Sequence, residues 1–225
     1  MFYPSNLHSN KWLSYYAEYF NTVELNMSFY RTPYSNIVKS WLKNTHKDFI
    51  FTVKASRFIT HIKKLADIND SIKNLYQLVS KFENKCRCIL FQFPPSFYSD
   101  INNLRKLKEL FELLDYNYDH ALEFRNESWW DNKYYHFLKG KAAFCIVDGL
   151  RMPENFVVTN NFIYIRFHGH NYNTLYSKEE LQDYSKKIKN LSKEYSINYA
   201  YIYFNNDVNC YAVKNAMYLK ELLNN

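Results

Sequence analysis

Charged side chains recur at the ends of short apolar runs in this chain. The run HALEFR carries Glu123 and Arg125, and the run FIYIRFHG carries Arg166 and His168. Guanidinium groups bind phosphate-like oxyanions in a bidentate geometry, whereas carboxylates and imidazoles transfer protons near neutral pH. These residue types predict a site that holds an anion and moves a proton.

The same pattern extends to other apolar runs, and it gives a set of candidate site residues. The candidate catalytic residues are Glu123, Asp148 and His168. We expect Arg125 and Arg166 to be the main holders of a small anion, with Lys54 adding a point charge. The full set of candidate binding residues is Glu24, Asn26, Lys54, His61, Gln92, Arg125, Arg166, Asn205, Asn206 and Asp207. The alternative is that Glu123, Arg125 and Arg166 form an internal salt-bridge layer without a ligand.

The elements that must position these residues are short strands that alternate with amphipathic helices. Such alternation indicates βα units around a parallel sheet. The seven expected strands are TVELNM (22–27), FIFTVKA (49–55), CILFQF (88–93), HALEFR (120–125), AAFCIVD (142–148), FIYIRFHG (162–169) and YAYIYFN (199–205). The residues SKEE after Tyr176 form a capping-box pattern and predict the start of a helix.

Side-chain parity within each run separates a polar face from an apolar face. In FIYIRFHG, for example, Ile163, Ile165 and Phe167 alternate with Tyr164, Arg166 and His168. In a parallel barrel the apolar face meets the outer helices, so the polar set points inward and ends at the carboxyl ends of the strands. The sequence therefore predicts a TIM-type (β/α) barrel whose site lies at those ends.

Two loops add polar groups to the predicted site. The segment KASRFITHIKK places Arg57, His61, Lys63 and Lys64 just after the strand that ends near Lys54, which favours an anion-binding surface. A solvated basic turn is the alternative for Lys63 and Lys64. The segment FNND (204–207) follows the last strand, where its amides and carboxylate can bind a ligand or Asp207 can cap the final helix.

Length and composition set the outer limits of this interpretation. The chain has 225 residues, of which 47% are hydrophobic and 23% charged, so we expect one folded domain over residues 1–225. We also expect a cytoplasmic protein without a membrane segment, because no apolar run approaches about 20 residues and the amino terminus does not resemble a signal peptide.

The four cysteines, Cys86, Cys88, Cys145 and Cys210, form no CxxC pair, which favours buried, reduced thiols. The formal net charge of +7 favours anionic partners.

A divalent metal is possible but not favoured, and the cofactor is otherwise unknown. Carboxylates with one imidazole suit Mg²⁺ or Mn²⁺, and Glu24, Glu123, Asp148, His168 and Asp207 supply that set. The chain lacks an HxH or HExxH pattern, which argues against a metal site built on histidines.

Ordered motifs along the whole chain resemble the family called domain of unknown function 72, or YecE-like. The matching segments are FYP (2–4), FNTVELNMSFYRTP (20–33), FTVKASRFITH (51–61), ILFQFPPSF (89–97), EFRNESW (123–129), Asp148, YIRFHG (164–169), Tyr176 and Ser177 with EEL (179–181), and YFNND with Ala212 and NA (215–216). This resemblance implies a TIM barrel. The family's usual first strand with its Gly-rich segment has no counterpart here, so seven strands and an incomplete closure are expected. Asn126 stands where the family commonly has His, which weakens a proton-transfer role at that position.

The resemblance implies no established reaction, so two functions are kept open. The first is an enzyme, a hydrolase or isomerase, acting on an anionic substrate such as a phosphate ester or sugar phosphate. The second is a non-catalytic nucleic-acid or metabolite binder in which exposed aromatic rings stack on bases. The fold-level similarity to endonuclease IV and xylose isomerase is analogy only, and the sequence does not indicate an oligomeric state.

Overall fold

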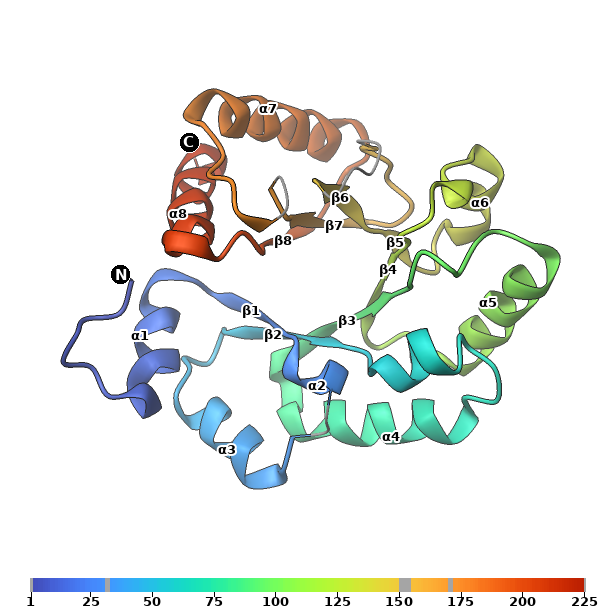
Figure 1. The fold of residues 1–225 in the computed structure, drawn as a ribbon, viewed down its shortest axis with the longest axis horizontal. Coiled ribbons are helices and arrows are strands. Elements are labelled where there is room, and N and C mark those ends of the chain that lie inside the picture. The colour runs from blue at the N-terminus through green and yellow to red at the C-terminus, as the bar shows by residue number, and fades with distance from the viewer. Residues whose placement is uncertain (1, 31–32, 150–154, 170–171, 225) are drawn as a thin grey trace. The chain divides into compact units, whose positions relative to one another are not determined.

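The computed structural model describes residues 2–30, 33–149, 155–169 and 172–224, which form two compact units (Figure 1). The first unit is Asn6–Trp129. The second unit combines Met1–Ser5 with Trp130–Asn225. Each unit is described by itself below.

The first unit is built on four parallel strands, each followed by helical segments. The strands are β1 (Thr22–Leu25), β2 (Ile50–Lys54), β3 (Cys86–Gln92) and β4 (Asp119–Glu123), and they pair in the order β1-β2-β3-β4. The helices are α1 (Trp12–Tyr19), α2 (Met27–Tyr30), α3 (Ser35–Lys43), the π-helix η2 (Phe58–Ile62), α4 (Asn69–Val79) and α5 (Ile101–Leu113). Short 3₁₀-helices lie at Ser9–Lys11, Ser80–Lys85 and Glu127–Trp129.

The second unit repeats the βα order with a three-stranded parallel sheet. Its strands are β5 (Ala143–Phe144), β6 (Ile146–Asp148), β7 (Phe162–Phe167) and β8 (Tyr199–Phe204), of which the last three pair in the order β6-β7-β8. Its helices are α6 (Asn132–Leu138), α7 (Lys178–Glu194) and α8 (Tyr211–Asn224), with a 3₁₀-helix at Val208–Cys210. The predicted capping box is confirmed, since Ser177 Oγ accepts from the Glu180 amide at 3.1 Å and the Ser177 amide donates to the Glu180 carboxylate at 2.7 Å.

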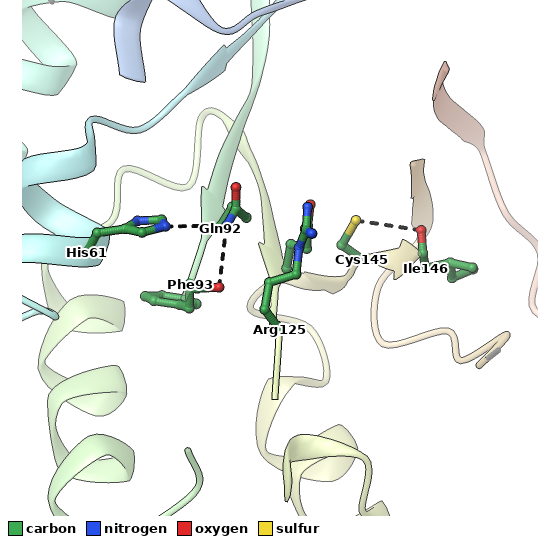
Figure 2. Close-up of polar contacts among 7 residues, drawn as sticks. His61, Gln92, Phe93, Arg125, Cys145 and Ile146 are labelled. Atoms are coloured by element: carbon green, nitrogen blue, oxygen red, sulfur yellow. Dashed lines mark hydrogen bonds and ion pairs between the residues drawn. The ribbon is translucent and has the colours of Figure 1, made fainter. Parts of the chain in front are cut away.

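The expected number of strands was wrong by one. All seven predicted runs contain strand, but the run at 142–148 divides at Cys145 into β5 and β6, so the described residues form eight strands. The Cys145 thiol donates to the carbonyl of Ile146 at 3.7 Å at this break (Figure 2). Residues 2–21 contain helices and no strand, as expected from the absence of the family's usual first-strand segment.

Strand ends also differ from the prediction by at most two residues. Lys54, Gln92, Glu123 and Asp148 are the last residues of their strands, whereas Arg125 lies two residues beyond β4. Asn26, His168 and Asn205 likewise follow their strands directly. Most predicted runs thus extend one or two residues past the carboxyl end of the strand, whereas β3 and β4 begin earlier than predicted.

The predicted parity is confirmed for β7 of the second unit. Ile163, Ile165 and Phe167 of β7 belong to one apolar cluster with Leu181 and Ile188 of α7. On the opposite face, the Tyr164 ring lies 5.9 Å and 5.4 Å from the rings of Tyr201 and Tyr203. Alternation along β7 therefore places Arg166 with this second, aromatic face.

The first unit shows the same division between faces. Phe51 of β2 packs against Trp41 of α3 and Phe82 of the following 3₁₀-helix, with ring centroids 6.4 Å and 5.2 Å away. Thr52 and Lys54, at the alternate positions of β2, are buried polar residues. The helix-facing side of β2 is thus apolar, and its other side carries Thr52 and Lys54.

Together these elements establish an α/β fold with parallel sheets. No closed barrel is detected among the strand pairs of the described residues, so closure into a TIM barrel is not confirmed. In the same described ranges, no helix has both the length and the apolar character that a bilayer span requires. Cys86, Cys88 and Cys145 are buried and carry free thiols, as expected, whereas the free thiol of Cys210 belongs to a partly exposed residue.

Candidate functional site

The strand ends of the first unit bring Lys54, Gln92 and Glu123 onto one edge of the sheet. Gln92 and Glu123 are register partners on β3 and β4, and Lys54 on β2 pairs with Leu90, two residues before Gln92. Parallel strands carry their carboxyl ends to the same edge, so these three polar groups are neighbours by topology. This edge is called the first strand-end site below.

Glu123 and Arg125 form an ion pair at this site. Arg125 Nε donates to Glu123 Oε1, with the Glu123 side chain fully buried and the Arg125 side chain 15% exposed. A buried carboxylate is costly to desolvate unless a cation and hydrogen bonds compensate it. Arg125 therefore stabilises the charge of Glu123 and still reaches the surface of the site.

Lys54 is the second cation of the first strand-end site. Its side chain is buried, and its Nζ lies 4.3 Å from the centre of the Phe29 ring, a cation–π distance. The hydroxyl of Ser28 donates to the Lys54 carbonyl at 2.7 Å, so α2 is tied to the end of β2. Among the other predicted residues, Glu24 is partly buried in β1, and Asn26 is exposed.

His61 reaches the site from the π-helix that follows β2. Its Nδ1 lies 2.8 Å from the Thr60 hydroxyl, and its Nε2 lies 3.5 Å from Nε2 of Gln92. Figure 2 shows the His61 ring and the Gln92 amide pointing toward each other. The Phe29 ring packs edge-on against the imidazole, with centroids 5.0 Å apart. Single turns of π-helix are rare and recur at functional sites.

Burial and surrounding cations keep the His61 imidazole neutral at pH 7. Desolvation is the largest cause and lowers its pKa to about 4, with Lys54, Arg57 and Arg125 adding charge repulsion and Glu123 opposing them. The first strand-end site thus gathers three cations around a neutral imidazole.

The second unit holds Asp148 in a different way. Its Oδ1 accepts from the Tyr184 hydroxyl at 2.6 Å, and its Oδ2 accepts from the Tyr176 hydroxyl. The Tyr176 hydroxyl in turn accepts from the Gly169 amide at 2.7 Å. Burial, followed by the Asp148 carboxylate, raises the pKa of Tyr176. Both oxygens of Asp148 are therefore occupied by phenol donors from α7 and the segment before it.

Two glycines let the backbone close around this network. Gly149 has φ +92°, and a Cβ there would stand 2.4 Å from the Gly169 carbonyl oxygen. Gly169 has φ +61°, and its Cβ would stand 3.0 Å from the Thr174 carbonyl oxygen. The chain has three glycines in all, so two of them serve this close approach.

Arg166 and His168 are both buried in the second unit. Arg166 pairs in register with Tyr203 of β8, and the amide of His168 donates to the Asp148 carbonyl at 3.0 Å. The His168 ring lies 5.1 Å from the Tyr172 ring in an edge-on arrangement. The predicted placement of Asp148 with Arg166 is wrong: Asp148 is the register partner of Phe167 and its side chain bonds to Tyr184 of α7, whereas Arg166 alternates to the opposite face of β7.

The amides after β8 anchor neighbouring segments. Asn206 Nδ2 donates to the Thr174 carbonyl at 2.8 Å and to Asn215 Oδ1 at 3.0 Å, which links the loop before α7 to α8. Asn205 donates its backbone amide to the Phe167 carbonyl at 2.7 Å. Asp207 is exposed, and within the described residues its side chain makes no capping hydrogen bond to the helix at Val208–Cys210.

Several contact residues were missed by the sequence interpretation. Tyr184 lies on the buried stripe of α7 with Leu181 and Ile188, where a tyrosine reads as core packing. Tyr176 directly precedes the capping box, and this position was the only sequence feature that pointed to its role. Thr60 gave no signal, because its role depends on the π-helix. In the described ranges, no group of three or more His, Cys, Asp and Glu side chains is arranged to hold a metal ion.

Comparison with known proteins identifies the family to which this chain is similar. The model of the family described as "Protein of unknown function DUF72" matches residues 1–225. The UPF0759 protein YunF of Bacillus subtilis (strain 168) is 28% identical, with 98% of this chain and 89% of YunF covered.

Solved structures agree with that match. A DUF72 family protein from Thermotoga maritima MSB8 superposes with a TM-score of 0.90 at 31% identity, covering 99% of this chain and 93% of that protein. One from Enterococcus faecalis V583 has a TM-score of 0.84 at 24% identity, covering 95% and 88%, a likeness of fold alone. The chain therefore belongs to the DUF72 family.

Proposed function

We propose that this protein is an enzyme that acts on an anionic, phosphate-containing substrate at the carboxyl ends of its strands. The observation that carries the proposal is the set of three cations, Lys54, Arg57 and Arg125, around a neutral His61. Glu123 is the carboxylate that opposes them, and it is already paired with Arg125. A site with this charge balance favours an anion, and the planar guanidinium of Arg125 can form bidentate hydrogen bonds to a phosphoryl group.

Substrate binding is proposed to depend most on Arg125 and Arg166. Arg125 is partly exposed beside the fully buried Glu123. Arg166 is a buried cation near the end of β7, and we propose that it supplies a guanidinium for the same class of anion. Glu24, Asn26 and Gln92 in the first unit, and Asn205, Asn206 and Asp207 in the second unit, remain proposed binding residues.

The catalytic role is proposed for Glu123, Asp148 and His168 as the sequence indicated. Glu123 accepts from a guanidinium, and Asp148 accepts from two phenols. We therefore propose that both carboxylates act by orienting other groups. The reaction class stays a hydrolase or an isomerase. The closed (β/α) barrel, the single-domain organisation and the cytoplasmic location belong to the same proposal, supported by the βα order and the family resemblance.

A screen of small phosphate esters and sugar phosphates tests the enzyme proposal. The expected result is saturable turnover of at least one compound, with kcat/KM reduced at least about tenfold in Arg125→Lys because the bidentate contact is lost. Arg105→Lys, on an exposed pair with Glu109, is the matched control and should keep full activity. Turnover that is equal in Arg125→Lys and the parent would contradict the proposal.

A second candidate, nucleic-acid or metabolite binding without catalysis, is favoured by exposed aromatic rings. Tyr30, Phe58 and Tyr98 are 79%, 44% and 53% exposed, and they follow β1, β2 and β3. Such rings beside cations suit base stacking. Affinity for a single-stranded oligonucleotide that falls steeply with salt, without turnover of any ester, would favour this candidate.

A further inference from the structure

We propose that His61 accepts the proton at the first strand-end site, and that Thr60 and Gln92 are positioning residues that present its Nε2 as the base. This inference deepens the proposed function, since it assumes an anionic substrate held by Lys54 and Arg125. It assigns to His61 the proton transfer that the sequence pattern gives to Glu123, Asp148 and His168.

The hydrogen bonds around His61 are consistent with one tautomer. Thr60 Oγ1 lies 3.3 Å from the Ser56 carbonyl and donates to it, which leaves the Thr60 oxygen to accept from His61 at 2.8 Å. In this arrangement His61 Nδ1 carries the proton. In a neutral imidazole the other nitrogen, Nε2, then has the lone pair.

Gln92 supports the same assignment from the other side of the ring. Its amide nitrogen lies 3.4 Å from the Phe93 carbonyl and 3.5 Å from His61 Nε2. The opposite amide orientation would place the Gln92 oxygen against the Phe93 oxygen, so the nitrogen faces both acceptors. A contact of 3.5 Å is at the outer limit of a hydrogen bond, so the Nε2 lone pair is readily released to a substrate.

The charges around the ring link its basicity to the substrate. Burial lowers the pKa of His61 most, Lys54 at the end of β2, Arg57 before the π-helix and Arg125 after β4 lower it further, and Glu123 opposes them. An anion bound to these cations cancels part of their repulsion and raises the pKa of His61 from about 4 toward its ordinary value. The base therefore becomes stronger when the substrate is in place.

The step itself is a simple proton transfer. Nε2 of His61 takes the proton of a water or substrate hydroxyl, and the electron pair of the broken O–H bond stays on that oxygen. The imidazolium that forms keeps its Nδ1–H bond to Thr60. It then gives the Nε2 proton to the leaving oxygen, which restores the neutral imidazole. No other reactant is required.

Nitrogen NMR of protein labelled at histidine tests the tautomer directly. The chain has seven histidines, and the resonances lost in His61→Gln identify His61. In the parent at pH 7 we expect a protonated Nδ1 and an unprotonated Nε2. Thr60→Val, which keeps the volume of a buried side chain and removes its oxygen, should change this tautomer in a folded protein. Finding Nε2 protonated in the parent would overturn the proposal.

Sulfate, which stays dianionic throughout this pH range, tests the link to the anion. Saturating sulfate should raise the His61 protonation midpoint by at least about one pH unit. Sulfate binding should strengthen as pH falls from about 6 to about 4 in the parent, with a flatter profile in His61→Gln. An unchanged midpoint with sulfate bound would overturn the role of His61 and leave the proposed function standing. No sulfate binding at all would overturn both.

Discussion

The strand ends of the two units hold their carboxylates in different ways. In the first unit Glu123 is paired with a cation, and further cations surround a neutral imidazole. In the second unit both oxygens of Asp148 accept from tyrosine hydroxyls, and the adjacent glycines allow a close backbone approach. The first arrangement gathers cations around a buried carboxylate and an imidazole, whereas the second uses neutral donors to fix a loop and a helix. The residue types alone do not separate these roles, because the partners decide them.

The largest effect should follow from breaking the ion pair of the first unit. Arg125→Ala removes the guanidinium from a fully buried Glu123, and we expect a loss of about 3 kcal/mol in the free energy of unfolding. Arg105→Ala removes a similar partner from an exposed pair with Glu109 and should cost less than about 1 kcal/mol. Urea unfolding of both variants measures the difference, and equal losses would contradict a buried pair.

A second test concerns the glycines of the second unit. Gly149→Ala places a Cβ against the Gly169 carbonyl at positive φ, and we expect a loss of about 2 to 3 kcal/mol. Gly140 also has positive φ, but its Cβ would meet nothing within 4 Å, so Gly140→Ala should cost about 1 kcal/mol. Thermal or urea unfolding that ranks the two variants the other way would refute the close approach.

The tyrosine contacts of Asp148 should have a smaller effect. Tyr184→Phe removes one donor to a carboxylate, and we expect a loss of about 1.5 kcal/mol. The matched control is Tyr218→Phe, whose hydroxyl accepts from the exposed Gln182 at 3.2 Å and should contribute little. If both substitutions are neutral, Asp148 does not depend on its phenol donors.

The smallest effect at neutral pH, and one that grows in acid, is expected from the histidines of the first unit. His120 and His61 both have a pKa lowered to about 4, mainly by burial. Their contribution to stability is present above the ordinary value of 6.5 and is lost as pH falls from 6.5 to about 4, since the unfolded chain binds the proton more tightly. His120→Gln should lose less unfolding free energy between about pH 7 and pH 5 than the parent, which urea titrations at both pH values can show.

The fold was largely predictable from the sequence, because burial imposes a period of two on each strand. Ile163, Ile165 and Phe167 were assigned to the helix-facing side, and they pack there. The break at Cys145 was not predictable, because the run AAFCIVD is uniformly apolar up to its final residue. The candidate residues were found as types, but the contacts of Tyr184 and Thr60 depend on tertiary packing that no local pattern records.

The most direct test of the anion site is calorimetric titration of the folded protein with inorganic phosphate. The parent should bind phosphate, and Arg125→Lys, which keeps the charge next to Glu123, should bind it about tenfold more weakly because the planar fork is lost. Lys63→Ala, whose ammonium packs 5.8 Å from the Phe58 ring, should change the affinity no more than about twofold. An Arg125→Lys protein that binds phosphate as tightly as the parent would contradict the proposed anion site.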